Sequence, residues 1–200
     1  LNMGIAGIPW WTTDSGGFFG ANINDPEFHE LLVRWFEYGC FCPVMRLHGY
    51  RWPLQPQYGT TGGATCVSGA PNEVWSYTDQ VCEILSDYLR LRERMLPYIT
   101  ELMEEAHEKG TPVMRPLFYD FPEDKESWNV ETEYMFGPKV LVKPITDADA
   151  RETDVYLPGG ASWTNAWTGE TFEGGQKVHV AAPIEQIPLF TRDGYKLPMK

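Results

Sequence analysis

Hydrophobic positions in the first half of the chain follow two different spacings. Residues 5–13 are mostly apolar and end in the sequence DSGG at 14–17, which is typical of a strand that leads into a glycine-rich loop. A helical stripe follows, with apolar residues at Phe28, Leu31, Leu32, Trp35 and Phe36. Residues 40–47 are again a short, mostly apolar run. Strand, helix and strand in this order predict two parallel strands joined by a right-handed crossover.

Local signals indicate where the helices begin and end. A second apolar stripe, from Val81 to Ala106, predicts one long amphipathic helix with a kink at Pro97. The expected ends are Asp25 with Pro26 and Gly39 for the first helix, and a capping box of Ser76 and Asp79 with Gly110 for the second. Both helices lie before residue 110, so the first half is α/β in character.

The second half has a different pattern. After residue 110, short β-rich runs alternate with turns at 158–160, 168–169 and 174–175, which is typical of an all-β sandwich. We therefore expect two domains, residues 1–110 and residues 111–200. Residues 49–74 are rich in Gly, Pro, Thr and Gln and form a longer connection than most, so we expect a functional or mobile loop.

Composition narrows the possible partners. The formal net charge is −12, from 28 acidic and 16 basic side chains, so nucleic acid and anionic membrane surfaces are disfavoured. No apolar run approaches the roughly 20 residues of a membrane span. Eight Trp, ten Tyr and ten Phe would suit the apolar faces of sugars, although aromatic cores are also common. The cysteines, at 40, 42, 66 and 82, are expected to be buried reduced thiols, since a zinc site needs a clearer Cys/His spacing.

Several motifs, in order along the chain, resemble glycoside hydrolase family 31. GIPWWTTDSGGF (7–18) resembles strand seven of the catalytic barrel and its loop, RWFEYGCFCPVMRLHG (34–49) the next helix and strand eight, and LRERMLPYI (91–99) the last barrel helix. Four later runs resemble the proximal C-terminal β-domain: 112–124, 133–145, 155–163 and 188–194. Lys143, where a small residue is expected, and the long loop depart from the family pattern.

The resemblance implies a fold and an activity. Two strands and their helices cannot close a barrel, so the expected fold is the C-terminal part of a (β/α)8 TIM barrel followed by an antiparallel β-sandwich. The implied function is that of a retaining α-glycosidase hydrolysing terminal α-linked xylose or glucose from oligosaccharides or glycosides, with no metal or organic cofactor. In the family both catalytic carboxylates precede the segment found here, so we expect no catalytic residue in this chain and no hydrolysis by it alone.

The same resemblance identifies candidate residues for the −1 sugar subsite. Asp14 would form the subsite wall and hold Arg46 through a charge-assisted hydrogen bond, unless it serves only the DSGG turn. His48 would hydrogen-bond a sugar hydroxyl, unless it is a surface-loop histidine. Phe18 is either a pocket wall or a staple for its loop. Trp11 is the last candidate for the subsite. Trp10 and Trp11 point to opposite faces of their strand, so at most one of them lines the pocket, and core packing is the alternative for both.

Four further expectations concern the rest of the molecule. Arg51 and Trp52, at the start of the long loop, are candidates to touch a leaving-group sugar. Trp128, Trp163 and Trp167 would either form a carbohydrate platform or support the last barrel helix. The rival function is a non-catalytic β-sandwich module that binds carbohydrate or protein. Because part of a barrel exposes strand edges and apolar surface, we also expect the chain to form a homo-oligomer.

Overall fold

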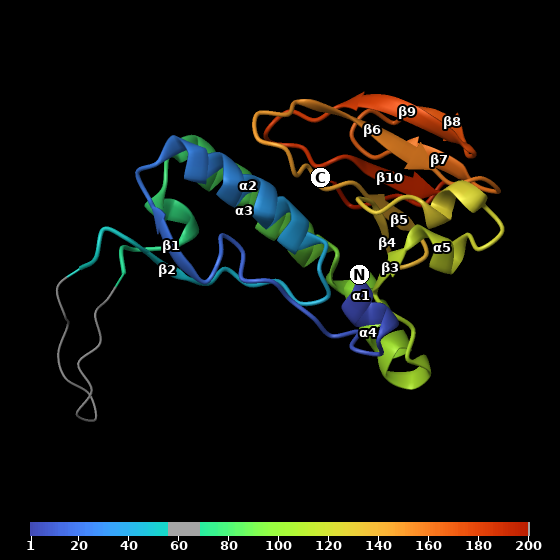
Figure 1. Ribbon diagram of the computed structural model, residues 1–200, viewed down its shortest axis with the longest axis horizontal. Coiled ribbons are helices and arrows are strands. Elements are labelled where there is room, and N and C mark those ends of the chain that lie inside the picture. The colour runs from blue at the N-terminus through green and yellow to red at the C-terminus, as the bar shows by residue number, and fades with distance from the viewer. Residues whose placement is uncertain (56–68, 200) are drawn as a thin grey trace.

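The computed structural model describes residues 1–55 and 69–199, and these form a helical half and a β half packed side by side (Figure 1). The helices are α1 (Asn2–Ile5), α2 (Pro26–Cys40), α3 (Asp79–Arg94), α4 (Leu96–Lys109) and α5 (Leu117–Asp120), with 3-10 turns η1 (Val74–Ser76) and η2 (Lys125–Trp128). The strands are β1 (Phe19–Asn22), β2 (Tyr50–Trp52), β3 (Met114–Pro116), β4 (Tyr134–Phe136), β5 (Val140–Val142), β6 (Glu152–Leu157), β7 (Ser162–Asn165), β8 (Thr171–Glu173), β9 (Gln176–Ala181) and β10 (Leu189–Arg192).

The parallel pair predicted in the first half exists, but its strands lie later in the chain than expected. β1 and β2, which precede and follow α2 in the sequence, pair with each other in parallel. The expected strands at 5–13 and 40–47 are wrong as regular strands, since α1 occupies 2–5 and Cys40 ends α2. The segments still run side by side, because Val44 N–H donates to the Trp11 carbonyl at 3.0 Å and Ser15 bridges Leu47. Proline at 9 and 43 removes amide donors and so prevents a regular ladder there.

Helix α2 follows the predicted signals at its start but not at its end. The Asp25 carboxylate accepts from the Glu27 amide at 3.0 Å and Pro26 begins the helix, as expected of an N-cap. The helix continues past Gly39 to Cys40, and Phe41 is its C-cap. Most of the stripe is buried, but Leu31 is 52% exposed, so the buried face is narrower than predicted.

The long helix predicted before Gly110 is two helices. α3 ends at Arg94 and α4 begins at Leu96, with Pro97 in the first turn of α4, so proline breaks the helix rather than bending it. Thr78, not Ser76, is the N-cap of α3, and its hydroxyl accepts from the Val81 amide at 3.3 Å. Gly110 closes α4 in the left-handed conformation, as predicted.

The β half is an antiparallel sandwich, as the sequence predicts. Strands β3, β4, β5, β10, β7 and β8 form one sheet in that order, and β6 pairs with β9 in the second. Both faces of the larger sheet are buried. In β4, Tyr134 and Phe136 belong to the core shared with α2, α3 and α4, whereas Met135 belongs to the core shared with β6 and β9. Alternation along each strand therefore connects the two halves through one sheet.

The three tryptophans of the β half do not form a platform together. Trp163 is completely buried in the sandwich core. Trp167 packs against the core shared with the helices, and its indole N–H donates to the Ile187 carbonyl at 2.7 Å. Trp128 is 58% exposed and stacks on Phe118. Trp167 thus has the supporting role that was one of the two alternatives.

Lys143, the departure from the family pattern, lies in a small polar cluster. Its ammonium donates to the Thr132 hydroxyl at 2.6 Å and lies 3.6 Å from the buried Glu133 carboxylate. Both oxygens of that carboxylate accept from the Tyr156 amide at 3.1 Å. The lysine therefore partners a buried acid at the start of β4. Within residues 1–55 and 69–199, no helix combines the length and apolar character that crossing a bilayer requires.

A buried polar network links α2 and α3 to the β half. The Arg34 guanidinium donates to Glu37 at 3.1 Å, and it also donates to backbone carbonyls at Ala150, Ala182, Pro183 and Gln186. The Tyr88 hydroxyl donates to Glu37 or to the Glu185 carbonyl, both at 3.1 Å, and accepts from the Ile187 amide at 3.0 Å. These carbonyls accept hydrogen bonds that water would otherwise accept from Arg34. The buried guanidinium is therefore not stabilised by the Glu37 charge alone.

Burial raises the pKa of Glu37 to about 8, against the lowering effect of Arg34. Between about pH 4.5 and pH 8 the folded chain therefore holds a proton that the unfolded chain releases, and stability falls as pH rises through this window. We predict that Glu37→Gln flattens the free energy of unfolding between pH 5 and pH 8, removing a slope of at most about 1.4 kcal/mol per pH unit. Urea denaturation at several pH values measures this.

Glu30→Gln is the matched control, because Arg151 holds the pKa of Glu30 below its usual range. The stability that ionised Glu30 contributes is lost only as the pH falls toward acid values. In Glu30→Gln the free energy of unfolding should therefore keep its slope between pH 5 and pH 8. Burial also raises the pKa of Glu133, to about 7, so the comparison is between each variant and the parent chain. Equal slopes for Glu37→Gln and the parent would contradict the prediction.

Candidate functional site

Asp14 and Arg46 form an ion pair between the two segments that approach β1 and β2. The Arg46 Nε donates to Asp14 Oδ1 at 2.8 Å, and Nη2 donates to the same oxygen. The Arg46 side chain is 51% exposed and the Asp14 side chain 23%. The charge-assisted hydrogen bond expected from the sequence is therefore present. Among the described residues, Oδ2 of Asp14 and Nη1 of Arg46 have no hydrogen-bond partner and retain bonding capacity.

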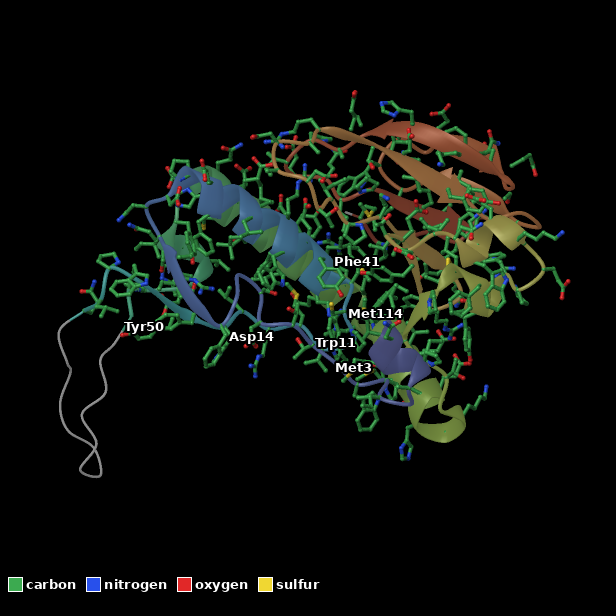
Figure 2. All side chains as sticks on the ribbon, viewed as in Figure 1. Met3, Trp11, Asp14, Phe41, Tyr50 and Met114 are labelled. Atoms are coloured by element: carbon green, nitrogen blue, oxygen red, sulfur yellow. The ribbon has the colours of Figure 1, made fainter. Side chains whose placement is uncertain are left out.

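Phe18 and His48 form a second pair across the same two segments. Their rings stack with centroids 5.6 Å apart and an angle of 28° between the planes. Phe18 is 69% exposed and His48 is also exposed, so both rings face outward. Figure 2 shows Asp14 between Trp11 and Tyr50 on the lower edge of the molecule, below α2. The structure thus makes two contacts, each joining a residue near the DSGG sequence to one in the RLHG sequence.

Trp11 has a different environment. It packs edge-on against Tyr38 of α2, with ring centroids 6.3 Å apart, and belongs to the border of the helical core. Trp10 is 54% exposed and stacks on His107 of α4. The two tryptophans therefore lie in different surroundings, as expected of neighbours in an extended segment. The assignment of Trp11 to the sugar subsite stays a prediction.

Arg51 lies beneath the two site loops rather than at their surface. It is fully buried, so the expectation that it contacts a leaving-group sugar is wrong. Its Nη1 donates to the Gly17 carbonyl at 2.9 Å and its Nη2 to the His48 carbonyl at 3.0 Å. Its charge also lies over the Phe28 ring, 5.1 Å from the centroid. Trp52, by contrast, is 42% exposed.

Sequence reasoning missed this role, because the residues that enclose Arg51 come from separate parts of the chain. Gly16 and Gly49 flank the two site loops and both have positive φ. A Cβ at Gly16 would lie 2.6 Å from Arg51 Nη2, and one at Gly49 would lie 2.5 Å from Nη1. Both positions leave space for the guanidinium because they lack a side chain, but Gly16 is far from Arg51 in the sequence, so only the structure shows that the two meet.

The candidate residues lie on an open face. Cavities of about 630 and 510 Å³ occur elsewhere, one between α3 and residues 185–186 and the other between α2 and residues 131–146. Neither is lined by Asp14, Phe18, Arg46 or His48. The four side chains therefore do not face either of these cavities.

The described residues contain no group of His, Cys, Asp and Glu side chains placed to hold a metal ion. Cys40 and Cys42 are buried free thiols, and burial raises the pKa of each to about 12. They are therefore protonated and unreactive at neutral pH, as predicted. Cys82 is partly buried and free, and Cys66 lies outside the described residues.

Comparison with known proteins identifies relatives along the whole chain. The family model described as the glycosyl hydrolases family 31 TIM-barrel domain matches residues 1–102, and that of the family 31 C-terminal domain matches residues 110–197. The chain is 39% identical to an α-xylosidase of Saccharolobus solfataricus, with all of the chain and 25% of the relative covered. It is 35% identical to α-glucosidase 2 of Bacillus thermoamyloliquefaciens, with 97% and 22% covered.

A solved structure resembles this one closely. It is that of a GH31 α-xylosidase from a soil metagenome, complexed with xylose. The TM-score is 0.93 at 51% sequence identity, with 98% of this chain and 29% of the other covered. The chain thus spans about a quarter of the length of the proteins it matches. Both of its halves match domains of one family in the same order, and the chain belongs to glycosyl hydrolase family 31.

Proposed function

We propose that the chain supplies part of the −1 sugar subsite of a retaining α-glycosidase that acts on terminal α-linked xylose or glucose. The observation that carries this proposal is the pairing of Asp14 with Arg46 beside the pairing of Phe18 with His48. Each pair joins the two loops that the family motifs supply. Membership of a glycoside hydrolase family supports a carbohydrate substrate.

The chemistry of the two pairs suits a monosaccharide. Asp14 Oδ2 accepts from a sugar hydroxyl, while Arg46 Nη1 donates to one, and the ion pair between them keeps both groups oriented. An imidazole ring such as that of His48 can hydrogen-bond sugar hydroxyls through its two nitrogens, and Phe18 offers an apolar face to sugar C–H groups. Hydroxyl contacts of this kind tighten as the oxocarbenium-like transition state forms, so they contribute to rate as well as to affinity.

The two catalytic carboxyl groups are proposed to come from outside these 200 residues. A retaining glycosidase needs a nucleophile and an acid/base about 5 Å apart on opposite sides of the scissile bond. Asp14 is engaged by Arg46, which suits orientation of the sugar rather than attack on it. The division of the chain into a barrel part, 1–110, and a β-sandwich part, 111–200, is part of the same proposal.

Relatives named as α-xylosidases and as α-glucosidases both occur, so the names alone leave two sugars open. An α-xyloside substrate is favoured by the RLHG sequence at 46–49, which resembles the α-xylosidase branch of the family. It is also favoured by the 51% identity to the α-xylosidase solved with xylose. We therefore propose α-xylosides as the first substrates to test, with α-glucosides as the second.

A second candidate, a carbohydrate-binding β-sandwich, is favoured by one observation. Trp128 is 58% exposed and its ring stacks on Phe118 with centroids 4.6 Å apart, giving an outward aromatic surface on the β half. Calorimetric titration of oligosaccharides into the 200-residue chain and its Trp128→Ala variant distinguishes the candidates. Binding that the variant abolishes supports the module, and absence of binding supports the enzyme.

A chimera tests the proposed enzyme directly. Residues 1–200 replace the matching segment of the Saccharolobus α-xylosidase, and hydrolysis of aryl α-xyloside and aryl α-glucoside is measured. We predict saturable turnover by the chimera and none by the 200-residue chain alone, because the carboxylates come from the other part. A folded chimera without turnover on either substrate would contradict the proposed function, and turnover by the chain alone would contradict the proposed origin of the carboxylates.

Asp14→Asn in the active chimera tests the ion pair. The amide keeps the shape but removes the charge that orients Arg46, so we predict a loss of roughly 10²-fold in kcat/KM. Asp87→Asn is the matched control, because Asp87 forms an exposed ion pair with Arg90 on α3 at 2.8 Å. Its kcat/KM should stay within about twofold of the parent. Equal, small effects of the two substitutions on kcat/KM would show that Asp14 serves only the DSGG turn.

Self-association is proposed for the 200-residue chain. Ile8, Trp10, Phe18 and Phe19 are between 47% and 69% exposed, and the parallel pair β1–β2 has no further strand beside it among the described residues. Exposed apolar side chains next to open strand edges favour contact between copies. We predict concentration-dependent dimers or larger species in sedimentation velocity, reduced by a Phe19→Lys substitution. A single monomer boundary at all concentrations would be the opposite result.

A further inference from the structure

Arg51 is a buried cation without a carboxylate partner among the described residues. Burying an unpaired charge is unfavourable, so such a group persists where its hydrogen bonds do something that an apolar side chain does not. Here the positive charge faces the carbonyls of Gly17 and His48 and the ring of Phe28. All of these contacts lie within the helical half.

The two carbonyls belong to the two loops that carry the site. Gly17 directly precedes Phe18, and His48 carries the ring that stacks on Phe18. One planar guanidinium therefore joins the backbone of one loop to the backbone of the other, through two hydrogen bonds of fixed relative direction. A lysine ammonium has no such fork and does not hold two acceptors in one plane.

The glycines of both motifs lie against the Arg51 guanidinium. A Cβ at Gly16 would meet the guanidinium first, and a Cβ at Gly49 would meet the Gly17 carbonyl oxygen first and the guanidinium next. Ala70 and Asn72 contact the same segment: the Ala70 amide donates to the Arg51 carbonyl at 2.9 Å, and the Asn72 side chain donates to the Gly49 carbonyl at 3.3 Å. Arg51 therefore contacts both site loops through its guanidinium and Ala70 through its backbone carbonyl.

We propose that Arg51 is a positioning residue of the sugar subsite, which sets the relative placement of Phe18 and His48 by joining the backbones of their two loops. This inference rests on the proposed function for its effect on catalysis, but not for its effect on the loops. Arg51 itself touches no substrate, since it is fully buried.

The first experiment needs no activity. The ring protons of His48 lie close to the Phe18 ring, and Phe18→Ala assigns their resonance in an NMR spectrum of the 200-residue chain by moving it. We expect Arg51→Lys to move the same resonance toward its position in Phe18→Ala. Arg94→Lys is the matched control, because Arg94 also donates to two backbone carbonyls, those of Pro198 and Met199, but lies on α3. An unchanged His48 resonance in folded Arg51→Lys would overturn the proposal.

The second experiment is a double-mutant cycle in the chimera. We expect Arg51→Lys to lower kcat about 10- to 100-fold with KM within about threefold, since small displacements of orienting groups cost rate. In a His48→Ala background, Arg51→Lys should lower kcat by less than a further factor of about two, because the ring that Arg51 positions is already absent. Losses that multiply in full would show that Arg51 acts through general stability and would overturn the proposal.

Two provisions keep the result decisive. If Arg51→Lys does not fold, Phe28→Leu replaces it, because it keeps the guanidinium but removes the ring beneath it. We expect Phe28→Leu to move the His48 resonance in the same direction and to lower kcat about three- to tenfold. Its effect on kcat should also be smaller in the His48→Ala background. If the parent chimera is inactive while the His48 resonance moves as expected, the proposed function fails and the linkage of the two loops by Arg51 stands.

Discussion

Backbone carbonyls in irregular segments must find hydrogen-bond donors when they are buried, and arginine meets this need throughout the helical half. Arg34 binds carbonyls of the β half, Arg51 binds those of the two site loops, and Arg92 binds those of Cys40, Cys42 and Pro43 at 2.6–2.7 Å. A guanidinium has five N–H donors in one plane, so a single side chain joins several segments at once. The segments between regular elements are held by these groups.

The site depends on this arrangement because each of its contacts spans two loops. Asp14 and Phe18 come from one segment, and Arg46 and His48 from the other, so neither pair forms unless both loops are correctly placed. Arg51 joins the loops from below. Arg92 fixes the end of α2, from which the chain runs directly to Arg46. The exposed polar groups thus rest on a buried polar layer.

The β half supports the same region through its larger sheet. One face of this sheet packs on the helices and the other on β6 and β9, so the two halves share a core. The Tyr134 hydroxyl donates to the Phe41 carbonyl at 3.0 Å, just after α2 ends. A strand of the sandwich therefore contacts the segment that leads to Arg46 and His48.

The sequence by itself determined the features that depend on neighbours within about four residues. The Asp25 N-cap, the Gly110 C-cap and the alternation in the β half follow from local hydrogen bonds and side-chain direction. The ordered motifs were enough to identify the family, and the motif resemblance also anticipated the hydrogen bond between Asp14 and Arg46. The caps and the alternation need no knowledge of distant contacts, whereas the Asp14–Arg46 bond was expected only from the resemblance.

Only the tertiary structure decided where strands pair, where the long helix breaks and which side chains are buried. Residues 5–13 resemble a strand, but a strand requires a partner with free amides, and the chain pairs at β1 and β2 instead. Arg51 resembles a surface residue because its charge favours water. It is buried because the carbonyls of Gly17 and His48, 34 and three residues away, replace that water once the loops meet. Burial is a property of the assembled fold, and no local pattern in the sequence contains it.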